Sequence, residues 1–155
     1  MKIENLISPE RIRCNPPAKS KKKALEILSQ LLQSDAVNVS HEEIFENLTG
    51  RERLGSTGLG HGVALPHARV PGQEVAIGAF IKLDEGIDFD SIDNQPADLL
   101  FSLLVPDHFT DEHLDILSQL ANMFNDAAFC EKLRNCQTEE QLHQLLTSKQ
   151  ASSAA

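Results

Sequence analysis

A histidine directly after a proline is the residue of this sequence best suited to chemistry. His67 follows Pro66 at the end of a short apolar run, Val63-Ala64-Leu65. Because proline fixes its own backbone φ angle, this histidine is held by a stiff piece of chain. An imidazole with an ordinary pKa of about 6.5 is largely neutral at cellular pH and is then a nucleophile. Neutral imidazole can attack phosphorus, so His67 is a candidate covalent carrier of a phosphoryl group.

The segment before this histidine is rich in glycine. Half of the eight glycines of the chain lie between residues 55 and 62. Without a Cβ, a glycine lets the backbone approach a ligand closely and point its N–H groups at an anion. The segment does not predict a nucleotide site. Gly58 to Val63 lacks the GxGxxG spacing, and it leads from an expected helix into a strand, the reverse of the dinucleotide-binding order.

Four further residues are candidates to stabilise a phosphoryl group on His67. Arg51 lies at the expected end of a helix, and Ser56 and Thr57 offer hydroxyl and backbone N–H groups. His113 lies in the first turn of a later expected helix, where the helix dipole favours anions. His67, Arg51 and His113 also have ordinary structural interpretations: a surface residue at a strand end, an arginine stabilising a helix C-terminus and a half-exposed helix residue, respectively.

Amphipathic patterns and capping residues predict the helices that would position these groups. The second expected helix ends before Gly55, and the third should turn Leu114, Leu117, Leu120, Ala121 and Phe124 inward. The expected helices begin at Ser20, Ser40, Thr110, Asp126 and Thr138.

Three apolar segments are expected to be strands, namely residues 63–65, 75–83 and 97–105. The last two are apolar on both faces for much of their length, so helices must cover both faces of the sheet. Residues 1–19 are expected to be irregular and residues 84–95 to form an acidic loop, with turns at Ser34-Asp35 and Pro71-Gly72. This order of elements predicts an α/β or α+β domain.

Composition narrows the choice of partner. The chain has 155 residues, which suits one domain, and a formal net charge of −9. The acidic balance argues against duplex DNA or an anionic membrane, and the lack of Trp and Tyr argues against base stacking. The longest apolar run, residues 99–105, is too short to span a bilayer. We therefore expect no nucleic-acid partner and no stable membrane insertion.

The cysteines and a third histidine of interest, His61, bear on one other class of function. Cys14, Cys130 and Cys136 match no CxxC spacing, which favours reduced thiols in a cytoplasmic protein. His61, His67 and His113 would suit a non-enzymatic metal-binding or sensor protein. The spacing of His61 and His67 fits no repeat on one face of a helix or strand, and we expect His61 to be exposed.

The segment Gly58-Leu59-Gly60-His61-Gly62-Val63-Ala64-Leu65-Pro66-His67 resembles the phosphohistidine motif of the IIA domains of the bacterial phosphotransferase system, of the mannitol, fructose and nitrogen class. Residues 20–25 are most similar to the nitrogen-regulatory branch. Ala68 differs from the glycine that follows the histidine in many relatives. Further matches are residues 51–58, 92–101, 104–106 and 110–117.

This resemblance implies the fold and the roles of the site residues. It implies one domain over residues 1–147, with a mixed β-sheet covered by helices on both faces, followed by a flexible tail at 148–155. His67 would accept the phosphoryl group on Nε2, with Nδ1 bonded to the backbone. His113 would stabilise the phosphoryl group and Arg51 would offset its charge. Ser56, Thr57 and Gly58 are the expected phosphoryl-binding residues, and the family uses no metal or nucleotide cofactor.

The resemblance also implies a function. The protein would be a cytoplasmic phosphotransferase component that takes its phosphoryl group from an HPr-like phosphocarrier protein. Its phosphorylation state would regulate target proteins such as transporters or sensor kinases, and a homodimer is left open. The alternative within the same system is a sugar-specific IIA component, of fructose or mannitol type, that passes the group to a permease IIB.

Overall fold

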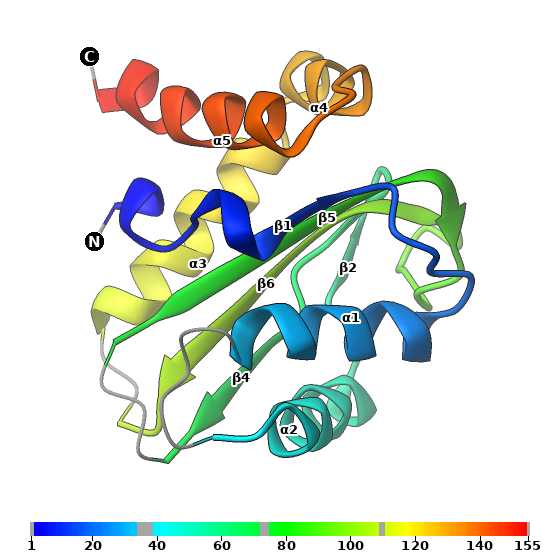
Figure 1. Ribbon diagram of the computed structural model, residues 1–155, viewed down its shortest axis with the longest axis vertical. Coiled ribbons are helices and arrows are strands. Elements are labelled where there is room, and N and C mark those ends of the chain that lie inside the picture. Colours follow the sequence, from blue (N-terminus) through cyan, green and yellow to red (C-terminus); the bar gives the residue numbers. More distant parts are fainter. Residues whose placement is uncertain (1, 34–38, 72–74, 109–110, 155) are drawn as a thin grey trace.

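The computed structural model describes residues 2–33, 39–71, 75–108 and 111–154, and within them a six-stranded mixed sheet lies between two layers of helices (Figure 1). The strand order is β1-β5-β6-β3-β2, with β4 also paired to β6. Only β5 with β6 and β2 with β3 pair antiparallel. The strands are β1 (Ile12–Cys14), β2 (Gly58–Gly60), β3 (Val63–Ala64), β4 (His67–Val70), β5 (Ile77–Ile87) and β6 (Ala97–Pro106).

Four of the helices begin where their capping residues predict, the first of them with the Lys23 N–H donating to Ser20 Oγ at 3.1 Å. Ser40 Oγ accepts from the Glu43 N–H at 3.2 Å, Asp126 caps the fourth helix through the Phe129 N–H, and Thr138 caps the fifth through Gln141. The helices are α1 (Lys21–Gln33), α2 (His41–Leu54), α3 (Asp111–Phe124), α4 (Ala127–Arg134) and α5 (Glu139–Ala154), with short 3₁₀ turns η1 (Ile3–Asn5) and η2 (Pro9–Arg11).

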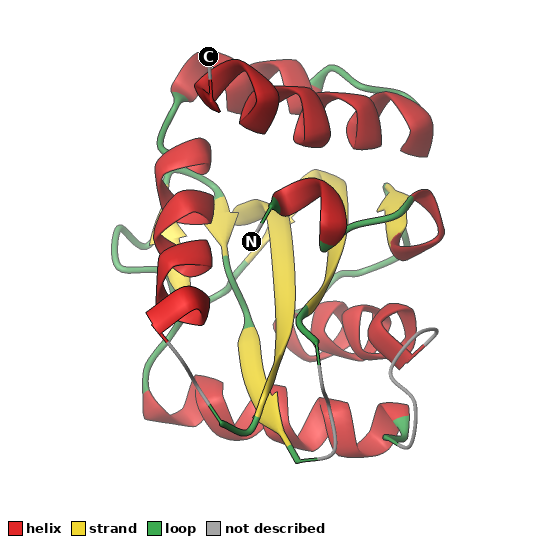
Figure 2. Cartoon of the chain, turned by 90° about the vertical axis from the view of Figure 1, so that its left-hand side faces the viewer, coloured by secondary structure: helices red, strands yellow, loops and turns green. Residues whose placement is uncertain are grey.

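The central strand β6 divides the interior into two cores. Phe101 and Leu103 pack with residues of α3, α4 and α5 on one face, whereas Leu100 and Leu104 pack with α1 and α2 on the other. Successive side chains of a strand point to opposite faces, so a continuous apolar run needs both faces covered. Figure 2 shows the strands in yellow between these groups of helices. The prediction of helices on both faces is confirmed.

Two strand predictions need correction. The N-terminal segment, expected to be irregular, contains β1, which pairs with β5 in the register Ile12↔Phe80. A three-residue edge strand depends on the backbone of its neighbour, so its own sequence hardly indicates it. The strand expected at 75–83 runs on to Ile87 and takes the first part of the expected acidic loop, because Ile87 pairs with Ala97 beyond a register shift. Polar side chains are tolerated in this solvent-exposed part of the pair.

The inward face of α3 also differs from the prediction. Leu114 is 54% exposed, while Ile116 and Leu120 are buried against the sheet. The buried face of the helix contains His113, Ile116 and Leu120. Leu114 follows His113 directly and therefore points about 100° away from it around the helix axis.

Some expected turns and helix ends lie next to or outside the described residues. The turns at Ser34-Asp35 and Pro71-Gly72 and the helix start at Thr110 lie wholly or partly outside the described residues. Helix α5 includes the expected tail as far as Ala154, and the domain limit at residue 147 stays a prediction. All three cysteines are free thiols. Within the described ranges, no helix combines the length and the apolar character that a membrane crossing requires.

Candidate functional site

His67 is the first residue of β4, beside the middle of the central strand. It pairs with Leu103 of β6 in a parallel register, and the Leu103 N–H donates to the Pro66 carbonyl at 3.0 Å. The strand expected to stop at Pro66 therefore resumes directly after it, because the proline interrupts the ladder without turning the chain away from β6. The histidine is held by paired backbone on both sides.

The ring of His67 is fixed by a local hydrogen bond. Nδ1 lies 2.8 Å from the carbonyl oxygen of Leu65. A carbonyl oxygen can only accept, so Nδ1 carries the hydrogen and Nε2 carries the lone pair of the neutral ring. Of the two ring nitrogens, Nε2 is therefore the nucleophilic one.

The surroundings keep this ring neutral. Burial is the largest influence and lowers the pKa of His67 below its ordinary value, and the nearby cations Arg51 and Arg69 lower it further. The Leu65 hydrogen bond and the Glu52 carboxylate act in the opposite direction and only partly compensate. Since the pKa lies below 6.5, the ring is neutral and nucleophilic at neutral pH.

Arg51 lies in the last turn of α2 and acts on the site electrostatically. Its Nη1 donates to the carbonyl oxygen of Gly55 at 2.9 Å, so it also fulfils the structural role of stabilising the helix end. Its charge is among those that lower the pKa of His67. Arg69 does the same from β4, two residues after the histidine and on the same face of the strand. Sequence reasoning did not select Arg69, although this spacing of two could have indicated it.

His113 is on the same side of the sheet as His67. The Leu103 side chain, which neighbours His67 on β6, belongs to the core that contains Ile116 and Leu120 of α3. His113 precedes Ile116 by almost one turn and is only 5% exposed, so it lies on the inward face of α3. The ordinary interpretation of His113 as a half-exposed helix residue is therefore wrong.

The segment from Ser56 to Gly58 is held by internal hydrogen bonds. Ser56 Oγ donates to the Phe89 carbonyl at 2.7 Å and accepts from the Gly58 N–H at 3.0 Å. Thr57 donates its hydroxyl and its N–H to the carboxylate of Glu52. These donors stabilise the loop, and their direct contact with a phosphoryl group stays a prediction.

Glu52 is a residue of the site that sequence reasoning missed. It is 9% exposed and continues the buried line of α2 that runs through Ile44 and Leu48 at intervals of four residues. An acidic residue at such an otherwise apolar position is unusual, because a buried carboxylate needs partners. That position in the helical pattern could have indicated it.

The glycines of this loop allow close contacts. A Cβ on Gly58 would collide with Ser91, and one on Gly62, whose φ is +84°, would collide with the guanidinium of Arg134. Arg134 binds Asp98 through two hydrogen bonds and donates to the His61 carbonyl at 2.9 Å. The prediction that the His61 side chain is exposed is confirmed.

The part of the chain that the structure describes contains no group of three or more His, Cys, Asp or Glu side chains that could hold a metal ion. His61, His67 and His113 thus do not form such a group with one another.

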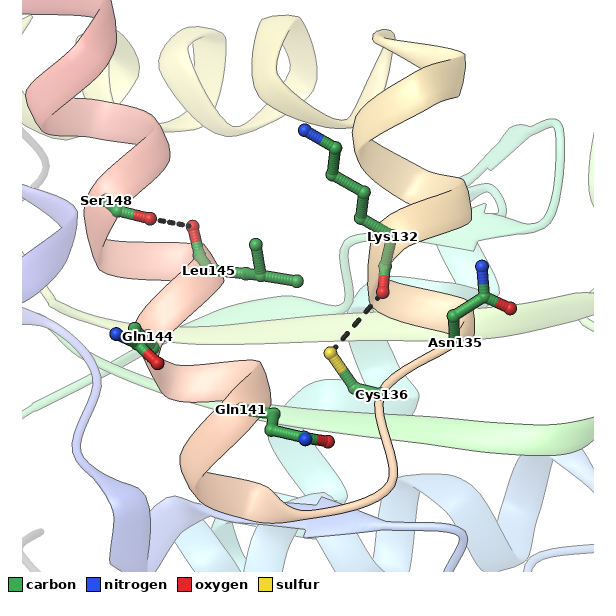
Figure 3. A pocket seen from close by; sticks show the side chains of 7 residues that line it. All are labelled: Lys132, Asn135, Cys136, Gln141, Gln144, Leu145 and Ser148. Carbon is green, nitrogen blue, oxygen red and sulfur yellow. Dashed lines mark hydrogen bonds between the residues drawn. The ribbon is translucent and has the colours of Figure 1, made fainter.

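A cavity of about 550 Å³ between α4 and α5 lies outside this constellation (Figure 3). It is lined by residues such as Lys132, Cys136 and Leu145, and it includes none of the candidate site residues. His67 instead lies at the start of β4, where it is partly exposed.

Comparison with known proteins identifies relatives of this chain in sequence and in fold. The chain is 42% identical over 150 residues to the nitrogen regulatory protein of Pseudomonas aeruginosa, with 97% of each chain covered. The crystal structure of nitrogen regulatory protein IIA-Ntr from Neisseria meningitidis superposes with a TM-score of 0.89 at 41% identity, covering 94% of this chain and 99% of that one.

The structure of IIA mannitol from Escherichia coli shares the fold, with a TM-score of 0.75 at 23% identity, covering 90% of this chain and 98% of that one. The predicted mannitol-type fold, a single domain with a mixed sheet and helices on both faces, is confirmed. Residues 5–149 match the family model described as phosphoenolpyruvate-dependent sugar phosphotransferase system, EIIA 2. The chain therefore belongs to the type-2 EIIA family of this phosphotransferase system.

Proposed function

We propose that this protein carries a phosphoryl group on Nε2 of His67 as a nitrogen-regulatory IIA component. The observation that carries the proposal is the hydrogen bond of Nδ1 to the Leu65 carbonyl, which directs the lone pair to Nε2. Membership of the EIIA family and the similarity to nitrogen regulatory proteins support it.

The transfer follows from this ring geometry. Nε2 attacks the phosphorus of a phosphohistidine on the donor protein, and the donor N–P bond breaks with its electron pair returning to the donor ring. A new bond joins phosphorus to Nε2, while Nδ1 keeps its proton and its hydrogen bond to Leu65. The product ring is cationic, and a carbonyl dipole at Nδ1 stabilises that charge.

Cations and the second histidine complete the proposed site. Arg51 and Arg69, which both act electrostatically on the ring, would offset the negative charge of the phosphoryl oxygens. His113, on the same side of the sheet, would steady the phosphoryl group by hydrogen bonding. Ser56, Thr57 and Gly58 would reach these oxygens only by exchanging their present hydrogen bonds.

Exposed apolar side chains beside the site offer a docking surface for the donor. Leu54 is 84% exposed three residues after Arg51, and Leu59 is 42% exposed within β2. Ile92, 86% exposed, lies between Ser91, which abuts Gly58, and Asp93, which accepts from the His61 N–H. Apolar side chains gathered at the surface are typical of protein contacts. We assign this surface to an HPr-like phosphocarrier.

Phosphorylation would act as a switch in a cytoplasmic signalling protein. A phosphoryl group adds about −1.5 to −2 charges at one surface site, enough to change which proteins bind there. The targets we propose are regulated proteins such as transporters or sensor kinases.

The test is phosphorylation in a defined mixture. The protein is incubated with phosphoenolpyruvate, enzyme I and the HPr-like carrier, and mass spectrometry under alkaline conditions then counts phosphoryl groups. We expect one group, lost in His67→Ala and kept in the matched variant His61→Ala. Undiminished labelling of His67→Ala would place the acceptor elsewhere. Rapid onward transfer to a sugar-permease IIB domain would favour the sugar-specific alternative.

A further inference from the structure

Glu52 is a buried carboxylate directly behind the glycine-rich loop. Its side chain is 4% exposed and accepts from Thr57 twice, through the backbone N–H at 3.2 and 3.3 Å and through the hydroxyl. Burying a charge is costly unless it is paired and hydrogen-bonded, so a residue in this position needs a cation as well as these donors.

Lys21 supplies that cation from a distant part of the sequence. Its Nζ lies 2.9 Å from Glu52 Oε2 and 3.5 Å from Asp90 Oδ2. The same ammonium lies 4.6 Å from the centroid of the Phe89 ring, whose π face also attracts cations. The side chain of Lys21 is 21% exposed, whereas its neighbour Lys22 is exposed. Lys21 thus fastens the start of α1 to the end of α2.

A chain of hydrogen bonds leads from this ion pair to the reactive ring. The Thr57 carbonyl accepts from the Leu65 N–H at 3.1 Å, and the Leu65 carbonyl in turn accepts from Nδ1 of His67 at 2.8 Å. Glu52 therefore holds Thr57, which in turn holds Leu65. Leu65 is the residue whose carbonyl orients His67. Each link is a direct contact between described residues.

We propose that Lys21 and Glu52 are positioning residues for phosphoryl transfer: by fixing Thr57 they fix the Leu65 carbonyl and, through it, the orientation in which His67 presents Nε2 to the donor. The proposal rests on the proposed function of His67. It assigns a role in the transfer to two residues that need not touch the phosphoryl group.

The test compares Lys21→Met with two matched variants. Lys21→Arg keeps the positive charge, and Lys22→Met removes a neighbouring exposed charge that has no place in the chain of contacts. Thr57→Val removes only the hydroxyl donor and provides a second, milder break in the same chain. Circular dichroism and thermal unfolding establish that each variant is folded before it is used.

Two readouts separate positioning from general stabilisation. Nitrogen-15 NMR of the unphosphorylated protein reports which nitrogen of His67 carries the hydrogen, and it does not depend on any transfer reaction. Single-turnover phosphorylation at varied phosphocarrier concentration separates the maximal transfer rate (kcat) from the half-saturating phosphocarrier concentration (KM). A displaced reacting group lowers kcat strongly while leaving docking unchanged.

For Lys21→Met we expect a mixture of the two ring tautomers, a fall in kcat on the order of tenfold to a hundredfold, and a nearly unchanged KM. Thr57→Val should shift both readouts in the same direction by less, and Lys21→Arg and Lys22→Met should resemble the wild type. If Lys21→Met does not fold, the tautomer readout of Thr57→Val decides, because Thr57 is also a proposed phosphoryl-binding residue and its kcat alone does not separate the two roles.

Three results would overturn the proposal. The first is a folded Lys21→Met protein, or Thr57→Val in its place, with wild-type kcat and a single tautomer. The second is a fall in kcat with an unaltered ring, and the third is an equal loss in Lys22→Met. Failure of the proposed function itself is recognised separately, because His67→Ala would then still be labelled while the NMR readout stays interpretable.

Discussion

The carbonyl oxygen of Leu65 accepts a hydrogen bond of 2.8 Å from Nδ1 of His67, only two residues further along the chain. Pro66 lies between them and is itself tied to β6 through the Leu103 N–H. Three consecutive residues therefore set the orientation of the ring. Its pKa depends first on burial, then on this same Leu65 hydrogen bond, and then on charges from α2 and β4.

The pH dependence of phosphorylation should follow from that pKa. Burial and the neighbouring arginines lower the pKa of His67 below 6.5, so the nucleophilic neutral ring persists into mildly acidic solution. We expect the midpoint of the fall in phosphorylation rate at acid pH to lie below the ordinary histidine value of about 6.5. Rates measured between pH 4 and 8 check this, and a midpoint at or above 6.5 would contradict it.

The same shift should appear in stability. Because the folded-state pKa is lowered, the unfolded chain binds more protons than the folded chain in the window below 6.5. The stability that the neutral His67 ring contributes is fully present above pH 6.5. It is lost as the pH falls through the folded-state pKa of His67. In urea unfolding, the wild type should therefore lose stability relative to His67→Gln as the pH falls below 6.5, and a difference that stays constant with pH would contradict this direction.

Replacing His113 should affect the phosphorylated state more than the fold. The variant His113→Gln keeps a hydrogen-bonding side chain of similar size at a 5% exposed position, so we expect a loss of about 1–2 kcal/mol in the free energy of unfolding. Without the imidazole the phosphoprotein should be shorter-lived. Its decay, followed by alkaline mass spectrometry, checks this, and wild-type transfer rates in both directions would remove His113 from the site.

A methyl group on Gly58 should disturb the loop. Its Cβ would lie 3.0 Å from both Cα and Cβ of Ser91 and closer still to the hydroxyl, so the two segments must separate. We expect Gly58→Ala to lose about 1–3 kcal/mol of unfolding free energy, and an added Ser91→Gly to restore part of it.

The matched control for this change is Gly50→Ala. A Cβ at Gly50 meets nothing within 4 Å, and the residue lies inside α2. We expect it to gain about 0.5–1 kcal/mol, because alanine loses less entropy than glycine in a helix. Equal effects of the two substitutions would show that the contact with Ser91 does not matter.

Arg134 should anchor the glycine-rich loop from α4. Its removal in Arg134→Met leaves the Asp98 carboxylate and the His61 carbonyl without their charged donor. We expect a loss of about 1–3 kcal/mol by chemical unfolding, together with faster amide exchange at residues 58–62. Glu131→Gln, which removes only an exposed ion pair at 3.9 Å, should change stability little.

The docking surface can be tested at Ile92. Its side chain is 86% exposed, so Ile92→Asp should leave the unfolding free energy unchanged within about 0.5 kcal/mol. Placing a charge in an apolar contact should raise KM for the phosphocarrier on the order of tenfold, with kcat little altered. A normal KM would exclude Ile92 from the contact.

Much of this protein follows from short-range patterns in its sequence. Ser40, Asp126 and Thr138 mark the helix starts, because a cap depends on groups three residues away. The continuous apolar run of β6 implies cover on both faces. The Pro66-His67 pair and its glycines point to a reactive imidazole, and their resemblance to EIIA domains is confirmed by the family match.

Only the tertiary structure decided which distant charged side chains meet around the glycine-rich loop. Lys21 and Glu52 are 31 residues apart and meet because α1 and α2 pack on the same face of the sheet, and Arg134 reaches His61 only because α4 lies beside the loop. The burial of His113 and the pairing of β1 likewise depend on how layers stack. Periodicity and capping are local, whereas a buried ion pair exists only once distant segments exclude water together.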